Sequence, residues 1–240
     1  MNTILWIHGF PFSSRIFDRQ RSIDAAHVIP DLPGFGGSRP PEGSMRMESY
    51  ARRLLDSMPA ETFVVAGLSM GGYIAFALAQ IAPERIEGLI LLDTRATADT
   101  EEQRKARYDM IAKVREEGVQ PVIDAMLPKM LTPAAPSSLV AEVRAIMEES
   151  SPEGVIAALD AMAKRSASVD LLPTLDVPAL IVVGEEDPIT PPSDAERMAE
   201  LLPNARVVRV AGAAHVANVE QAEVVNGVIG EWLNEVVGSR

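Results

Sequence analysis

The segment Gly67-Leu68-Ser69-Met70-Gly71 joins two stretches of different character. The β-branched run Thr62–Ala66 precedes it, and Met70–Ile81, rich in Ala, Phe and Leu, follows it. A Gly-x-Ser-x-Gly pattern between a strand and a helix predicts a sharp, strained turn that lifts the serine oxygen above a sheet. Its two glycines let the strand and helix backbones pass closely, because glycine has no Cβ. We therefore predict that Ser69 is a nucleophile.

Short apolar runs recur along the chain and alternate with amphipathic segments. They are nearly continuous in hydrophobicity, which is typical of strands buried on both faces of a parallel sheet. The predicted strands are Thr3–Ile7, Val28–Pro30, Thr62–Ala66, Gly88–Leu92, Ala179–Val183 and Arg206–Val210. The helices predicted to accompany them are Met47–Met58, Met70–Ile81, Ser193–Leu202 and Val219–Val237. This alternation indicates an α/β fold with a doubly wound, mostly parallel sheet of about six strands.

The alternation stops between the fourth and fifth predicted strands, where residues 97–169 contain no strand pattern. Helical segments separated by prolines fill this stretch: Thr100–Glu117, Val119–Leu127, Ser137–Ser150 and Glu153–Lys164. We expect a helical lid here, inserted in one core that is formed by residues 1–96 and 170–240. Methionine suits adaptable apolar pockets. We therefore predict that Met126 and Met130, together with Phe12, line a substrate pocket under the lid.

A serine hydroxyl needs a base within hydrogen-bond reach, and the base needs an acid to orient it. In folds with this kind of turn, the acid follows the serine in the chain and the histidine comes last. Asp187 ends the segment after the fifth predicted strand, and His215 lies just after the sixth. Both fall at carboxyl ends of strands, where open α/β sheets place their sites. Asp93, which ends the fourth strand, is the alternative acid. We prefer Asp187 because three prolines follow it closely and would fix its loop.

The negative charge that develops on a substrate oxygen needs two backbone N–H donors. One is expected from Met70, the residue after the nucleophile. The other is expected from the loop His8-Gly9-Phe10-Pro11, where Phe10 is the candidate because proline has no N–H. Arg95 is a possible anchor for an acidic substrate, but we expect it to lie on the surface. The sequence therefore favours a small, neutral acyl group.

Composition excludes several other functions. The 240 residues include 34 acidic and 22 basic side chains, a net charge of −12, which argues against binding to nucleic acid or to anionic membranes. The chain has no cysteine and only three histidines without paired spacing, so no metal site is expected. The N-terminus lacks the pattern of a signal peptide and no apolar run is long enough to span a membrane, so we expect a cytoplasmic protein.

Taken together, the ordered motifs resemble those of the α/β-hydrolase superfamily. The resemblance covers most of the chain and rests on His8-Gly9-Phe10, Asp31–Ser38, Gly67–Gly72, Gly184–Asp187 and Gly212–His215. Within the superfamily the chain is most similar to small carboxylesterases and 3-oxoadipate enol-lactonases. Members usually carry an antiparallel hairpin before the His-Gly strand, and that hairpin is missing here, so a trimmed sheet is expected.

The resemblance implies a serine hydrolase that cleaves a small carboxylic ester or lactone through a Ser-His-Asp triad and an acyl-enzyme, without cofactor or metal. A small-molecule ester or lactone is then the expected partner. Related hydrolases of carbon–carbon bonds, perhydrolases and lyases or synthases reuse the same triad, and these remain an alternative. A non-catalytic ligand receptor on this fold is a second alternative. The sequence leaves the oligomeric state open.

Overall fold

The computed structural model describes residues 3–237. Its centre is a sheet of six parallel strands in the order β2-β1-β3-β4-β5-β6. The strands are β1 (Thr3–Ile7), β2 (Ala26–Val28), β3 (Phe63–Leu68), β4 (Ile86–Leu92), β5 (Ala179–Gly184) and β6 (Ala205–Val210). The predicted parallel sheet is thus confirmed. The edge strand lies two residues earlier than predicted: β2 spans Ala26–Val28 instead of Val28–Pro30, and Pro30 has no N–H to donate to a ladder.

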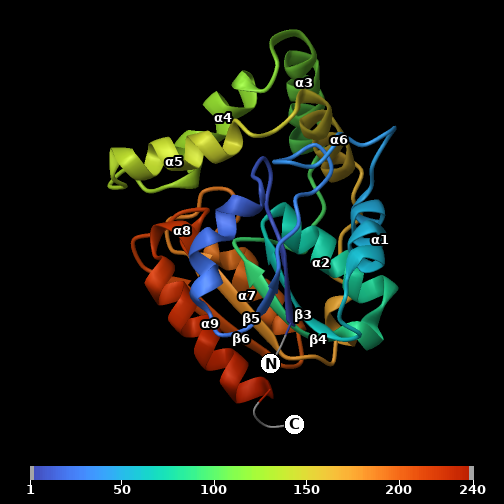
Figure 1. The fold of residues 1–240 in the computed structure, drawn as a ribbon, viewed down its shortest axis with the longest axis vertical. Helices are drawn as coiled ribbons and strands as arrows, with labels where there is room; N and C mark the ends of the chain where they lie inside the picture. The colour runs from blue at the N-terminus through green and yellow to red at the C-terminus, as the bar shows by residue number, and fades with distance from the viewer. Residues whose placement is uncertain (1–2, 238–240) are drawn as a thin grey trace.

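Helices cover both faces of the sheet, as a doubly wound fold requires (Figure 1). One face packs against α1 (Met47–Ser57), α2 (Met70–Ile81) and α7 (Pro192–Leu201). The other packs against η1 (Ser14–Ser22), α8 (Ala217–Glu220) and α9 (Ala222–Val237). Alternate strand residues point to opposite faces, so Leu5 and Ile7 join the first core and Ile4 and Trp6 the second.

Two elements differ from the sequence prediction. The long helix predicted over Val219–Val237 begins earlier and is interrupted at Gln221, whose side chain donates a hydrogen bond to the Gly212 carbonyl. The polar, arginine-rich segment Ser14–Ser22 forms a 3-10 helix that was not predicted. Its apolar signal is limited to Ile16 and Phe17, which are buried in the second core.

A helical insertion lies between β4 and β5, above the carboxyl ends of the strands (Figure 1). It consists of α3 (Glu101–Glu117), α4 (Gln120–Met130), α5 (Ser137–Met147) and α6 (Pro152–Ala163). These helices follow the four predicted segments closely, although α4 continues through Pro128. Within residues 3–237, no helix is both long and apolar enough to cross a membrane.

Specific contacts attach the insertion to the rest of the molecule. Ser150 Oγ donates to the Pro11 carbonyl at 2.8 Å, and Arg19 forms a two-bond ion pair with Glu142. Near α6, Gly34 and Gly154 pack backbone against backbone, since a Cβ on Gly154 would lie 2.5 Å from the Gly34 oxygen. These contacts support an insertion that sits over the core, while the division into a core and a lid at residues 97–169 stays a prediction.

Candidate active site

Ser69 occupies the tight turn between β3 and α2. Its φ of 52° and ψ of −111° are strained for a residue with a side chain, a feature that clusters at functional sites. The flanking glycines are required sterically: a Cβ on Gly71 would lie 1.9 Å from the Ile7 oxygen, and one on Gly67 would lie 2.5 Å from Gly71. The predicted turn is therefore present, and α2 begins immediately after the serine.

A chain of hydrogen bonds connects three residues selected from the sequence. Ser69 Oγ lies 2.8 Å from His215 Nε2, and His215 Nδ1 lies 2.8 Å from Asp187 Oδ2. With a proton on Nδ1, His215 donates to the carboxylate and Nε2 accepts from the serine hydroxyl. All three side chains are buried, Ser69 being 8% exposed and His215 0%. This is the arrangement in which a histidine can take a proton from serine.

Asp187 is kept ionised by its own loop. Its Oδ1 accepts from the backbone N–H groups of Ile189 and Thr190, and its Oδ2 accepts from the Thr190 hydroxyl. Burial opposes ionisation, but His215 and the Thr190 hydrogen bonds outweigh burial and hold the pKa of Asp187 below its usual value. Sequence reasoning missed Thr190. A threonine three residues after Asp187 in a proline-bounded loop is a pattern of side chain–backbone turns and could have indicated it.

Asp93, the alternative acid, has a different position. Its carboxylate accepts from the backbone N–H of Gly184 at 2.8 Å and of Ala217 at 3.1 Å, whereas His215 meets Asp187. Burial, reinforced by the nearby Asp187 charge, raises the pKa of Asp93 well above its usual value. Asp93 therefore joins the loop that follows β5 to the loop that carries His215.

The loop after β1 lies directly against the nucleophile. A Cβ on Gly9 would lie 3.2 Å from the Cβ of Ser69. His8 fixes this loop: its Nδ1 pairs with the Gly9 carbonyl, and its Nε2 accepts from the Leu32 N–H at 2.9 Å. Burial lowers the pKa of His8 to about 4, so its ring is neutral near pH 7. His8 is thus a structural residue, and Phe10 follows it in the loop.

A cavity of about 330 Å³ lies beside these loops. Phe10, Pro188 and Ile189 line it from the core, and Met110, Val122 and Met126 line it from the insertion. Met126, which was predicted to line a substrate pocket, lies on the wall of this cavity. Phe12 and Met130 are not on this wall, because both are fully buried in the apolar cluster between the second face and the insertion.

Arg95 also lines the cavity, contrary to the expectation of a surface arginine. Its side chain is only 11% exposed, because it pairs with the buried Asp99 four residues later. Among residues 3–237, no group of three or more histidine or carboxylate side chains is placed to hold a metal ion.

The fold and this site define an α/β hydrolase. The model of the alpha/beta hydrolase family matches residues 4–228, and the chain belongs to that family. Over 205 residues it is 27% identical to 3-oxoadipate enol-lactonase 2 of Acinetobacter baylyi, covering 83% of this chain and 75% of the relative.

Two solved structures are also similar. One is a thermophilic esterase from Thermogutta terrifontis, described with malate bound, which has a TM-score of 0.93 and 36% identity over 98% of this chain and 90% of its own. The other is the enol-lactonase from Burkholderia xenovorans, with a TM-score of 0.89 and 25% identity. The similarity covers 97% of this chain and 91% of that structure's chain. The resemblance expected from the motifs is therefore confirmed at the level of family and fold.

Proposed function

We propose that this protein is a serine hydrolase that cleaves a small carboxylic ester or lactone. The observation that carries the proposal is the continuous path of hydrogen bonds from Ser69 Oγ through His215 to Asp187. The similarity to an esterase and to enol-lactonases supports the same class of reaction.

The reaction proceeds in two acyl transfers. His215 Nε2 takes the hydroxyl proton as Ser69 Oγ attacks the carbonyl carbon, and the imidazolium then gives this proton to the departing alcohol oxygen. A water molecule next attacks the Ser69 ester and passes a proton to His215. The acid leaves, and the proton returns to Ser69 Oγ. Asp187 stays ionised throughout and stabilises the imidazolium.

Two backbone N–H groups hold the oxyanion in this mechanism. Met70 is the first residue of α2, and the first N–H groups of a helix have no acceptor within the helix. Phe10 supplies the second N–H from the loop that lies against Ser69. Both donors are fixed before the substrate binds, so little reorganisation is needed when charge develops.

The test is turnover of a chain-length series of p-nitrophenyl esters by the wild type and by Ser69→Ala. The variant should lose at least about 1,000-fold in kcat. Ser138→Ala is the matched control, because Ser138 is exposed on α5 and should leave turnover unchanged.

Labelling by a fluorophosphonate separates the alternatives. An inert wild type that is still labelled at Ser69 would point to a carbon–carbon substrate, perhydrolysis or a lyase reaction. An inert and unlabelled protein would overturn the hydrolase assignment and favour a ligand receptor.

A further inference from the structure

A group of arginines beside the cavity carries more positive charge than its one carboxylate can neutralise. Arg95, Arg107 and Arg165 all form ion pairs with Asp99, which is buried. Burial raises the pKa of Asp99, but Arg107 and Arg165 outweigh burial and lower it to about 2. Asp99 is therefore fully ionised near pH 7, and three guanidinium groups still share one negative charge.

These arginines differ in how many of their N–H donors have hydrogen-bond partners. Arg165 also donates to the carbonyls of Thr97 and Met162, and it lies 4.0 Å over the ring of Tyr73. Arg107 makes two hydrogen bonds to Asp99. Arg95 reaches Asp99 and Gln103 through Nη2, but in the described part of the chain its buried Nε has no hydrogen-bond partner. A buried unpaired donor is costly, and a charged one more so.

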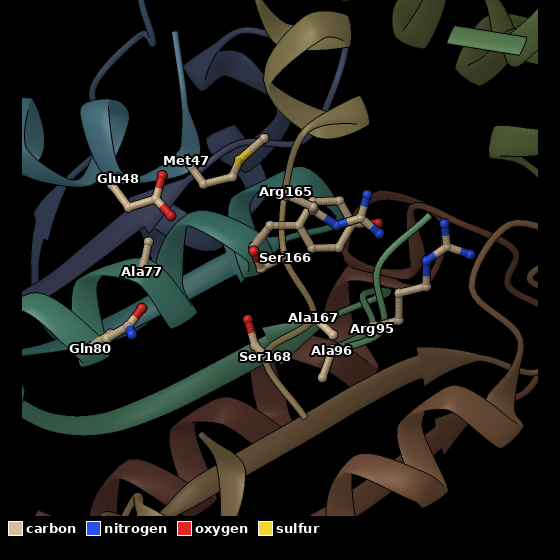
Figure 2. Close-up of a pocket in the computed structure, with 11 residues that line it drawn as sticks. Met47, Glu48, Ala77, Gln80, Arg95, Ala96, Arg165, Ser166, Ala167 and Ser168 are labelled. Carbon is tan, nitrogen blue, oxygen red and sulfur yellow. The ribbon is translucent and has the colours of Figure 1, made fainter. Parts of the chain in front are cut away.

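Figure 2 shows how Arg95 is oriented. The side chains of Arg95 and Arg165 carry their guanidinium groups to the same side of the view, away from Glu48 and Gln80. Arg95 also forms part of the wall of the 330 Å³ cavity beside Phe10 and Ile189. Arg95 therefore borders the cavity next to the loops of Phe10 and Asp187, although its Nε itself is buried.

The cavity wall is cationic in a strongly acidic protein. Arg95, Arg107 and Lys129 line it, and of the described residues on this wall none is acidic. Lys129 is exposed on α4 and, within residues 3–237, makes no ion pair. Asp194 is the other carboxylate near Arg95, but its interaction with Arg95 is electrostatic at a distance, without a hydrogen bond. The rest of the wall is apolar, including Phe10 and Met126.

We infer that the substrate is an ester or lactone that also carries a carboxylate, and that Arg95 and Lys129 bind this carboxylate. This inference rests on the proposed function and names its substrate class. A carboxylate accepts several hydrogen bonds at once, so it can bind the exposed ammonium group of Lys129 and the part of the Arg95 side chain that lines the cavity. The apolar part of the wall fits the hydrocarbon segment between the carboxylate and the scissile carbonyl. A neutral chain would bring no negative charge to these cationic side chains.

The first experiment compares two esters of equal chain length. Methyl hydrogen glutarate ends in a carboxylate, and methyl pentanoate ends in a methyl group. The wild type should show a kcat/KM at least about tenfold higher for the anionic ester, with a KM that rises when salt is added. Lys129→Gln and Arg95→Gln should each reduce this preference by about tenfold, because each removes a charge-assisted contact. Arg95→Lys should restore part of it.

Lys113→Gln is the matched control, since Lys113 is an exposed lysine on α3 away from the cavity wall, and it should change neither ester's turnover. Lys129 is exposed, so its variant should fold even if Arg95→Gln does not. A wild type that prefers methyl pentanoate, or a preference that survives both Gln variants, would overturn the inference while the hydrolase proposal stands.

Binding provides a readout that does not depend on turnover. Calorimetry on Ser69→Ala should detect glutarate, the dicarboxylate product, and should find pentanoate at least about tenfold weaker. Loss of glutarate binding in the double variants Ser69→Ala/Lys129→Gln and Ser69→Ala/Arg95→Gln supports the carboxylate site even if no ester is hydrolysed. Equal affinity for both acids would contradict it.

Discussion

Oγ1 of Thr190 lies 2.6 Å from Oδ2 of Asp187, the same oxygen that meets His215 Nδ1. The Thr190 hydroxyl therefore helps to keep the Asp187 carboxylate ionised and in position. Thr190 Oγ1 is also 3.3 Å from His215 Nδ1, so it lies at the junction of the acid and the base. The only sequence signal for this threonine is its spacing of three residues from Asp187 in a proline-bounded loop.

Replacing Thr190 by valine removes the hydroxyl and keeps the shape. We expect kcat for a p-nitrophenyl ester to fall by about tenfold, because one of the hydrogen bonds that favour ionised Asp187 is lost. The pH profile of kcat should change with it, whereas a purely structural defect would lower kcat equally at every pH. Thr190→Ser keeps the hydroxyl and should recover most of the activity. If valine and serine behave alike, Thr190 does not position the acid.

The raised pKa of Asp93 predicts a pH-dependent stability difference. A carboxyl with a higher pKa in the folded state stabilises the fold below its unfolded pKa, and this contribution is lost as pH rises through the folded pKa. Asp93→Asn should therefore lower the free energy of unfolding most at low pH. We expect a loss of about 1–3 kcal/mol there, because the hydrogen bonds from the Gly184 and Ala217 N–H groups are disturbed. The loss of stability caused by the substitution should become smaller as the pH rises above about 4, because the wild type then has to ionise Asp93 beside the Asp187 charge.

Urea unfolding of both proteins across this pH range measures the difference directly. Asp176→Asn is a suitable comparison, since Asp176 lies in an exposed contact with Asn204 and should show no such trend. A difference for Asp93→Asn that is constant with pH would mean that Asp93 titrates in its ordinary range.

The sequence was sufficient to predict the six strand segments of the parallel sheet and the residues at their carboxyl ends. Gly67–Gly71 requires its turn for steric reasons, and the carboxyl ends of parallel strands meet at one edge of the sheet. The loops carrying Asp187 and His215 therefore had to converge near Ser69. Their hydrogen bonds match the selection made from the sequence, and the catalytic roles of the three residues remain predictions.

Other features depend on packing that periodicity does not determine. Helix α4 is apolar on several sides, so its pattern does not tell Met126, which lines the cavity, from Met130, which is buried in the core. The burial of Arg95 depends on Asp99 and on two further arginines, Arg107 from α3 and Arg165 from the segment after α6. Which side chains line the cavity is thus decided by packing between elements, which the spacing of apolar residues does not reveal.

The close backbone contact between Gly34 and Gly154 predicts that the insertion is held tightly against the core. A Cβ at position 154 would lie 2.5 Å from the Gly34 oxygen, so Gly154→Ala forces α6 away from the loop. We expect a loss of about 1–3 kcal/mol in the free energy of unfolding. Gly227→Ala is the control, because that position in α9 faces open space, and alanine should stabilise the helix there by about 0.5–1 kcal/mol. Chemical denaturation measures both, and a neutral Gly154→Ala would show that the insertion moves easily.

Met126 and Met130 allow the cavity to be tested against the core within one helix. Met126→Ala removes side-chain volume from the cavity wall and should shift the preferred p-nitrophenyl ester to a longer acyl chain, with a small loss of stability. Met130→Ala removes the same atoms from a fully buried position, so it should cost about 2–5 kcal/mol and leave the chain-length preference unchanged. Each variant therefore serves as the control for the other when kcat/KM is measured across the ester series. An acyl chain can extend only where removing a side chain leaves space for it. If Met130→Ala shifted the chain-length preference and Met126→Ala did not, the substrate would therefore occupy a space other than this cavity.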